Sequence, residues 1–580
     1  MRLSYLLPLL MLAVLTVPAH AQQEQGQNTL LPEIDPQDIE IRSQFRARFP
    51  GLTRQPILGF DPNPRVFQID PDRMPFMESR DDVVASLSVS ELSRPAPPDY
   101  VPMSYSAPIG LFANAGFGSY TAPEAKLWGL YKPSDRSYVG MDLDLSTSLD
   151  DHLDQRPSTY RDFAANLEFG TKLDARTQLD VFGGMRSDFN YSAGFPPSGS
   201  STDYGQRSLT GFNLGAELRS MRNGVTGWDA RADLKFNGMK VNEGGGIRQG
   251  HEAVYEVGGR YQWAGSQPRE TWQVKGDVRG GIYSDEIGDG TTGWITLYGA
   301  AVYDRLFNYT TRLTAEAGAY YVANSMESAV LPGPRLSLKY WISERLTLQV
   351  QGEAAPRLFS RGQLYDRNRF VQIEQELGHS YDMRGSAEIS LAFFDEGRIY
   401  GGVSYRYGDN NPVFAYEGAL SAAAAAGDPP ADYRVYYDDL TVARIFGGVS
   451  HALVAETIWF HAEGYLQVPR LVDEVSYHSG DRVPFMETWG LNGSISFRPI
   501  NDIKVEGWAD LMGGRPANSQ QTLDAELDPV FLLGGRADVE ISDHFGVYAK
   551  IVNLLSQNYS MWYRYPERPL QVFGGVTLKL

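Results

Sequence analysis

Apolar and polar residues alternate along the last ten residues of the chain. Val572, Gly574, Val576, Leu578 and Leu580 occupy one set of alternate positions, and the residues between them are mostly polar or small. In an extended chain, a period of two places successive side chains on opposite faces. The pattern therefore predicts a terminal strand with one apolar face.

The same alternation recurs from residue 109 onward, and it predicts about 22 strands. At roughly 10 residues per membrane crossing, about 22 strands would need about 220 residues, so the length is sufficient. The predicted strands are 109–120, 124–132, 136–147, 160–172, 176–188, 207–220, 225–238, 251–264, 270–284, 292–304, 308–321, 331–342, 345–356, 379–394, 396–408, 432–449, 453–467, 485–498, 502–513, 528–541, 543–554 and 568–580.

Short and long connections alternate between these strands. Arg222 to Gly224, Asn501-Asp502 and Ser542-Asp543 are predicted to be tight turns. The long polar connections include Tyr191 to Gly205, Leu358 to Gly378, Asp409 to Asp432, Val468 to Val483 and Gly513 to Leu527. This alternation is typical of barrels with short periplasmic turns and longer outer loops.

Several predicted strands carry a row of charged residues on one face. A soluble sandwich would place such rows outside and a membrane barrel would place them in the lumen, and alternation alone does not distinguish the two. In the barrel they would form mixed-sign cross-strand pairs that brace the wall, or, as a sharper alternative, a selectivity ring. The candidate lumen-facing residues are Asp142, Asp144, Asp229, Arg231, Asp233, Lys235, Lys275, Asp277 and Arg279.

The first 21 residues favour the membrane barrel. Arg2, the apolar run from Leu6 to Val17 and the small-x-small sequence Ala19-His20-Ala21 are typical of a secretory signal peptide. We therefore expect residues 1–21 to be removed and the protein to reach the bacterial cell outer membrane. The predicted fold is all-β, a transmembrane antiparallel up-and-down β-barrel over residues 109–580, surrounded by outer-membrane lipid and lipopolysaccharide and inserted by the barrel-assembly machinery.

Composition agrees with this prediction. The mean hydropathy of −0.33 would usually indicate a soluble protein, but a barrel strand needs only every second residue to be apolar. The 59 glycines, 33 tyrosines, 27 phenylalanines and 10 tryptophans suit tight barrel walls and interfacial aromatic girdles. The net charge of −19 disfavours nucleic acid as a partner.

Residues 22–108 differ from the rest of the chain because they are rich in proline and lack long alternating runs. We expect an irregular segment that is either periplasmic or inserted in the lumen. Arg42, Arg46 and Arg48 lie in its patterned stretch, Ile39 to Phe49. An amphipathic docking strand or helix that contacts a periplasmic partner is the simpler interpretation, and a specific ligand site is the alternative.

Catalytic and cofactor chemistry is not predicted. The chain has no cysteine, which excludes disulfides, zinc-thiolate sites and a thiol nucleophile. Its eight histidines show no His-x-x-x-His spacing, and His461 with Glu463 is better explained as a lumen hydrogen-bonding pair than as a catalytic base. The acidic stretches 150–154 and 285–290 could hold calcium, although solvated loops are the simpler interpretation. We expect no enzyme activity, no cofactor and no metal.

The C-terminal region resembles the end of a TonB-dependent receptor barrel. The resemblance rests on Asn553-Leu554-Leu555, Tyr559, the segment Trp562 to Pro566 and the closing strand. It implies uptake of scarce large solutes with energy relayed from the inner membrane. Residues 22–108, however, are shorter than that family's plug, and no energy-coupling box lies near Gln22. Solute passage or uptake is therefore the first functional hypothesis, and a plug-less barrel that anchors a periplasmic or cell-envelope complex is the alternative.

Overall fold

The computed structural model describes residues 110–580 apart from the stretches 135, 152–157, 192–204, 223–225, 244–245, 286–290, 326, 374–375, 394–396, 417–432, 455–456, 474–479 and 518–524. The expected signal peptide, the segment 22–108 and the arginines Arg42, Arg46 and Arg48 lie outside the described residues.

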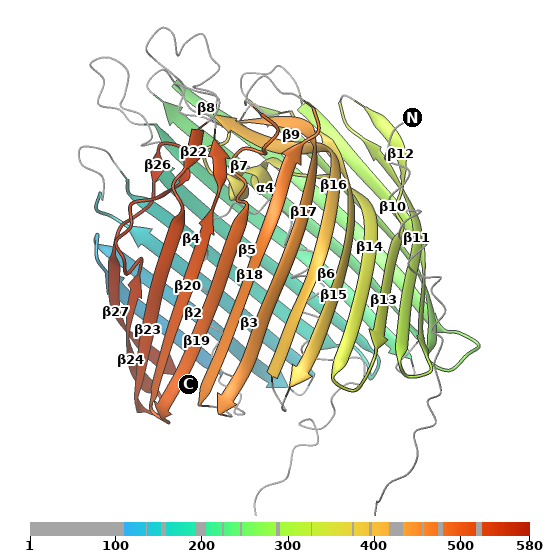
Figure 1. The fold of residues 1–580 in the computed structure, drawn as a ribbon, viewed down its shortest axis with the longest axis horizontal. Helices are drawn as coiled ribbons and strands as arrows, with labels where there is room; N and C mark the ends of the chain where they lie inside the picture. Colours follow the sequence, from blue (N-terminus) through green and yellow to red (C-terminus); the bar gives the residue numbers. More distant parts are fainter. Residues whose placement is uncertain are drawn as a thin grey trace, which may run out of the picture. The chain divides into compact units, whose positions relative to one another are not determined.

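The described residues form a closed antiparallel β-barrel of 22 strands (Figure 1). β12 and β13 count as one barrel strand because both pair with β11 and only Gly333 and Pro334 separate them. The barrel strands are β1 (Leu111–Gly118), β2 (Ala122–Ser134), β3 (Ser137–Ser148), β4 (Tyr160–Lys172), β5 (Thr177–Tyr191), β6 (Gln206–Arg222), β7 (Thr226–Glu243), β8 (Gly246–Ala264), β9 (Glu270–Asp285), β10 (Thr291–Phe307), β11 (Thr311–Ala323), β12 (Ser328–Pro332), β13 (Arg335–Trp341), β14 (Leu346–Leu358), β15 (His379–Phe393), β16 (Gly397–Tyr416), β17 (Tyr433–Val454), β18 (Ile458–Leu471), β19 (Trp489–Ile500), β20 (Ile503–Gly513), β23 (Val530–Ser542), β24 (Phe545–Val552) and β27 (Gln571–Lys579).

The terminal strand closes the barrel. β27 pairs with β24 on one side and with β1 on the other, in a register that runs from Phe112 opposite Lys579 to Gly118 opposite Phe573. Val572, Val576 and Leu578 are exposed, whereas Phe573 and Thr577 are buried on the other face. The predicted alternation is therefore that of a barrel strand, and pairing of the last strand with the first leaves no open sheet edge.

Every predicted strand overlaps an observed one, which confirms the fold class and the strand number. The main difference is length: β16 continues to Tyr416, well beyond the predicted end at residue 408. Val413 to Tyr416 are buried without a break, so both strand faces are covered there and a period of two no longer applies. Two short pairs, β21 (Arg515–Ala517) with β22 (Ala525–Leu527) and β25 (Ser560–Trp562) with β26 (Tyr565–Pro566), lie in long connections and were not predicted.

The two ends of the barrel differ in their connections. All turns at one end, from 135–136 to 543–544, are two to five residues long, and the C-terminal residue lies at the same end. The opposite end, uppermost in Figure 1, carries every longer connection, from 149–159 to 553–570. Short turns are periplasmic in outer-membrane barrels, so the long connections mark the outer end.

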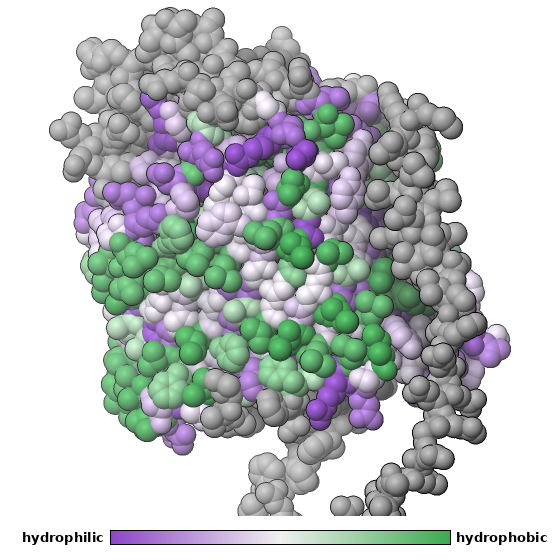
Figure 2. Space-filling model, viewed as in Figure 1, coloured by the Kyte–Doolittle hydropathy of each residue, from purple (hydrophilic) through white to green (hydrophobic). Residues whose placement is uncertain are grey.

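The outer wall is apolar. Phe212, Leu214, Leu234, Phe236 and Val257 are exposed on β6 to β8 and alternate with polar residues of the same strands. Apolar side chains gather over the middle and lower part of the wall, and polar ones gather at its upper edge (Figure 2). A band of this kind faces lipid, which places the protein in the outer membrane. Within the described residues, no helix is long and apolar enough to cross a membrane.

Candidate functional site

The connection between β14 and β15 folds into the barrel. Its described residues 359–373 and 376–377, which we call the inward segment, contain the helix α4 (Arg361–Arg367), and Figure 1 shows α4 inside the ring of strands near the outer end. Ser360 caps the helix through a capping box, in which its hydroxyl accepts from the Gln363 N–H and the Gln363 side chain accepts from the Ser360 N–H. The cap satisfies backbone donors that no water would reach at this buried position.

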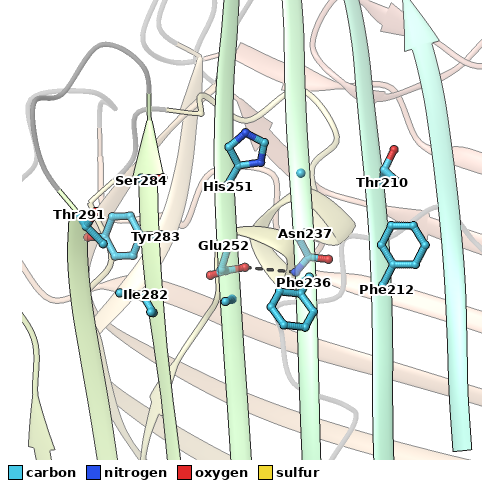
Figure 3. A pocket seen from close by; sticks show the side chains of 12 residues that line it. Thr210, Phe212, Phe236, Asn237, His251, Glu252, Ile282, Tyr283, Ser284 and Thr291 are labelled. Carbon is cyan, nitrogen blue, oxygen red and sulfur yellow. Dashed lines mark hydrogen bonds between the residues drawn. The ribbon is translucent and has the colours of Figure 1, made fainter.

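Glu252 of β8 attaches the start of α4 to the wall. Its carboxylate oxygens accept from the backbone N–H groups of Arg361 and Gly362 at 2.9 and 3.1 Å. The Asn237 amide of β7 donates to the same carboxylate at 3.3 Å, as the dashed line in Figure 3 shows. Glu252 is only 3% exposed, so its charge is stabilised mainly by these donors. Hydrogen bonds to an ionised acceptor are about twice as strong as neutral ones.

Further polar contacts hold α4 against β5 and β9. The Tyr365 hydroxyl donates to Asp188 at 2.7 Å and accepts from Asn190 at 3.0 Å. Burial, followed by the nearby Asp188 carboxylate, raises the pKa of Tyr365 well above its ordinary value, so its hydroxyl remains a donor. Arg186 pairs with Asp366 at 2.5 Å. The inward segment is therefore held by several oriented contacts to one wall.

The other side of the inward segment contacts the opposite part of the barrel. Gln372 N–H donates to the Tyr433 carbonyl at 2.9 Å, and Tyr433 N–H donates to the Phe370 carbonyl at 3.0 Å. The Phe370 ring stacks on Tyr565, with 3.5 Å between the ring centroids. Trp562 packs against Tyr433 with centroids 5.1 Å apart, and Tyr433 is fully buried.

One apolar core consequently bridges the outer mouth of the barrel. It joins Leu209, Met239 and Val254 of β6 to β8, through Leu364 and Tyr365 of α4, to residues of β16, β17, β20 and β23 and of the pairs β21–β22 and β25–β26. Strands that are distant around the ring thus share one packed cluster. The arrangement can obstruct the mouth, and it would do so without any contribution from residues 22–108.

Five of the nine predicted charged residues form ion pairs, three of them between strands and two within β7. Asp144 pairs with Lys126 at 3.0 Å, Arg231 with Asp233 at 2.5 Å and Lys275 with Glu316 at 2.7 Å. Asp229 pairs with Arg260, which lies directly opposite on β8.

The remaining four predicted residues are separate from these pairs. Asn166 donates to Asp142 at 3.5 Å, and Arg279 donates to Gln363 of α4 at 3.0 Å. Lys235 lies opposite Asn213 and Val254, and Asp277 lies opposite Gly258 and Tyr298. The structure does not gather the nine residues into one site. Their assignment as lumen-facing charged rows remains a prediction, and of the nine only Arg279 has a described contact with the inward segment.

Sequence reasoning missed the inward segment because it treated residues 358–378 as a polar loop. The overlooked signal is the set of apolar residues within that loop, among them Phe359, Leu364, Tyr365, Phe370 and Ile373, all of which are buried. An exposed loop rarely needs so many large apolar side chains. Their presence indicates a segment that packs against something.

A cavity of about 440 Å³ lies on the other side of the same wall (Figure 3). Phe212, Phe236 and Ile282 form its apolar part and His251 lies at one end. These side chains alternate with Asn237, Glu252 and Tyr283, which point toward α4. The cavity is therefore on the lipid-facing surface and is separate from the inward segment.

The described residues of the other candidate sites make ordinary structural contacts. His461 stacks on Trp459, and the Glu463 carboxylate instead accepts from the Tyr400 hydroxyl. Asp150 accepts from Thr121, and most of the two acidic stretches lies outside the described residues. In the part of the chain that the structure describes, no three His, Cys, Asp or Glu side chains are placed to hold a metal ion.

Comparison with solved structures identifies the barrel architecture. The ferric-catecholate import receptor Fiu from E. coli K12 matches with a TM-score of 0.60 and 9% identity, over 81% of this chain and 82% of that one. The chain has the barrel fold of TonB-dependent receptors. The copper transporter OprC matches with a TM-score of 0.61 and 10% identity over 81% and 80% of the two chains. The FrpB iron transporter from Neisseria meningitidis matches with a TM-score of 0.63 and 9% identity over 81% of each chain.

These similarities establish the fold that the C-terminal residues predicted. No protein-family model matches the sequence, and no curated protein matches it either. At 9 to 10% identity, the shared TonB-dependent receptor barrel does not carry over any solute or binding residue.

Proposed function

We propose that this protein passes a solute across the outer membrane, and that the inward segment closes the outer mouth of its lumen at rest. The observation that carries the proposal is the double attachment of the inward segment, to Glu252 on one wall and to Tyr433 on the other. A barrel that served only as an anchor would not need a bonded obstruction across its mouth.

The architecture supports the same proposal. A barrel of this strand number has a lumen wide enough to need an internal obstruction. Similar solved barrels are described as receptors and transporters. Residues 22–108 would be a second, periplasmic or lumen-inserted element that obstructs the pore or recruits a periplasmic partner. We further propose that the protein is not an enzyme. Energy-coupled passage would require residues 22–108 to contact a periplasmic partner.

Planar-bilayer recording of the full chain tests the proposal. In one variant, a short Gly-Ser linker replaces residues 361–376, and in the matched control the same linker replaces residues 418–431 between β16 and β17. We expect the first variant to give large, steady currents and the control to remain as quiet as the unaltered protein.

The alternative is a closed barrel that anchors an envelope complex, in which the packed core across the outer mouth would only brace the wall. If the first variant inserts as a folded barrel and carries no more current than the control, this alternative is favoured. If the first variant still carries no current after residues 22–108 are also removed, obstruction by that segment is excluded.

A further inference from the structure

Two rows of outward-facing residues cross the wall at the cavity shown in Figure 3. Each row joins residues that lie opposite one another on β6 to β10. The lower, apolar row consists of Phe212, Phe236, Ala253, Ile282 and Gly293. The upper, polar row lies two residues nearer the outer end on every strand and consists of Thr210, Gly238, His251, Ser284 and Thr291. The wall therefore changes from apolar to polar within the cavity.

The apolar row forms a groove with raised flanks. Phe212, Phe236 and Ile282 are 53%, 51% and 51% exposed. Ala253, between Phe236 and Ile282, has only a methyl group, and Gly238 above it has no side chain. The volume of about 440 Å³ is within the range of pockets that bind small molecules, about 300–1,000 Å³.

Two tryptophans toward the periplasmic end indicate the depth of the groove. Trp263 of β8 and Trp272 of β9 lie opposite each other, and tryptophan is enriched at membrane interfaces. Ala253 and Ile282 lie ten residues further toward the outer end on the same faces of these strands. Because a strand crosses the bilayer in about 9–11 residues, the apolar row lies at the outer end of the crossing. The polar row is then level with the lipid headgroups.

This position indicates what the groove holds. The wall around it faces lipid, so an acyl chain of the outer leaflet is the apolar group that reaches the apolar row. The polar row offers the hydroxyl groups of Thr210 and Ser284 and the ring of His251 at headgroup level, and Lys240 is exposed one step further along β7. In the outer halves of β6 to β9, Glu252 is the one acidic residue whose side chain the structure describes, and it faces α4 instead. These polar and cationic groups suit a phosphate.

We propose that the groove binds one phosphorylated lipid of the outer leaflet, with an acyl chain on the apolar row and the phosphate at the polar row. The residues that alternate with the two rows include Asn237 and Glu252, which hold α4. A bound lipid would therefore brace the part of the wall to which the inward segment is attached. This inference goes beyond the proposed function, and its test does not depend on solute passage.

Native mass spectrometry of the full chain in detergent, with dioleoyl phosphatidylglycerol added stepwise, tests the groove. We expect one lipid molecule to bind the unaltered protein more tightly than any further molecule. Gly238→Leu fills the floor of the groove, and a Cβ there would meet its nearest neighbour, His251 Nδ1, at an ordinary 3.5 Å. This variant should bind the first molecule at least about tenfold more weakly, the loss expected when a few methylene groups of the chain are displaced.

The matched control is Gly574→Leu on the lipid-facing side of β27, where a Cβ would have its nearest neighbour at 3.9 Å. It should bind the first molecule within about twofold of the unaltered protein. If Gly238→Leu does not fold, Phe236→Ala removes a flank of the groove and should also weaken binding, with Phe117→Ala, at an exposed phenylalanine of β1, as its control. Equal affinities of either groove variant and its control would overturn the proposal.

Two further probes test the chemistry of the lipid. Dioleoylglycerol has the same chains without the phosphate, so it should bind the unaltered protein more weakly than dioleoyl phosphatidylglycerol. Equal binding of the two lipids would overturn the assignment of a phosphorylated lipid. Glycerol phosphate has no acyl chain and should not displace the lipid, and displacement would show a site for free phosphate instead.

Discussion

Glu252 is the residue on which the position of α4 most depends. Glu252→Ala removes the acceptor of two backbone N–H groups, each bonded to an ionised carboxylate and contributing about 1.5–3 kcal/mol. The inward segment should then detach more often, so we expect intermittent bilayer currents and faster proteolysis within residues 361–376. Glu256→Ala is the control because Glu256 lies four residues further along β8, on the same face of the strand. If Glu252→Ala is cleaved no faster than the unaltered protein, Glu252 does not hold α4 in place.

Asp382 provides a second prediction at this scale. It is 2% exposed and contacts the buried Arg406, so Asp382→Asn leaves a buried guanidinium without its counter-charge. Breaking a buried pair in this way costs about 3–5 kcal/mol. We therefore expect a lower urea midpoint for unfolding in detergent. The control is Glu388→Gln, which breaks a more exposed pair on the same strand and should shift the midpoint much less. Equal shifts for the two variants would contradict the assigned role of the buried Asp382 pair.

At the scale of elements, the strand that closes the barrel gives the sharpest comparison, because two neighbouring glycines face opposite sides. A Cβ at Gly575 would overlap the Ala115 carbonyl oxygen and the Tyr548 ring, whereas one at Gly574 would have its nearest neighbour, the Tyr548 carbonyl oxygen, at 3.9 Å. Gly575→Val should therefore open the pairing of β1 with β27 and abolish the heat-modifiable migration of a folded barrel. Gly574→Val should leave that migration unchanged, and equal behaviour of the two variants would refute the register.

The strands could be predicted from the sequence and the inward segment could not. Alternation fixes a strand when one face meets lipid and the other meets polar side chains, as in β7 with Leu234 outside and Asp233 inside. Residues 359–377 have no such period because their partners are distant in sequence: Phe370 meets Tyr565 and Tyr365 meets Asp188. Only the apolar content of the loop signalled that it packs, and nothing in its pattern specified the partner.

At the scale of the whole molecule, the position of the lipid-facing wall can be tested by two adjacent residues of β6. Leu214, 58% exposed, lies near the middle of the strand, and an arginine facing the bilayer midplane costs about 2–4 kcal/mol. Leu214→Arg should therefore fold into lipid vesicles in much lower yield. Asn213→Arg places the same charge on the opposite face of the strand and should fold nearly as well as the unaltered chain. If Asn213→Arg instead folds in lower yield than Leu214→Arg, the face of β6 that carries Leu214 does not face lipid.

The ion pairs of the barrel wall could be predicted from the sequence only in part. Pairs such as Arg231–Asp233 and Asp144–Lys126 follow from residues that share a face or lie on adjacent strands. The ion pairs of Asp382 were missed because their partners Arg357, Arg384 and Arg406 lie on three strands whose register no sequence pattern fixes. The same limit applies to Glu252, whose importance depends on a helix more than 100 positions away along the chain.

The central claim is that the inward segment closes the outer mouth, and a reversible lock tests it most directly. A Cβ at Gly362 would lie 3.0 Å from the Asn237 Cγ, so cysteine side chains at these two positions would meet, and the chain has no cysteine of its own. The measurement is the bilayer current of the variant Asn237→Cys/Gly362→Cys/Glu252→Ala, before and after addition of a reductant to the same membrane. We predict no current while the disulfide holds α4 to β7, and currents once the disulfide is reduced. Equal currents in the two states, or silence in both, would contradict the claim.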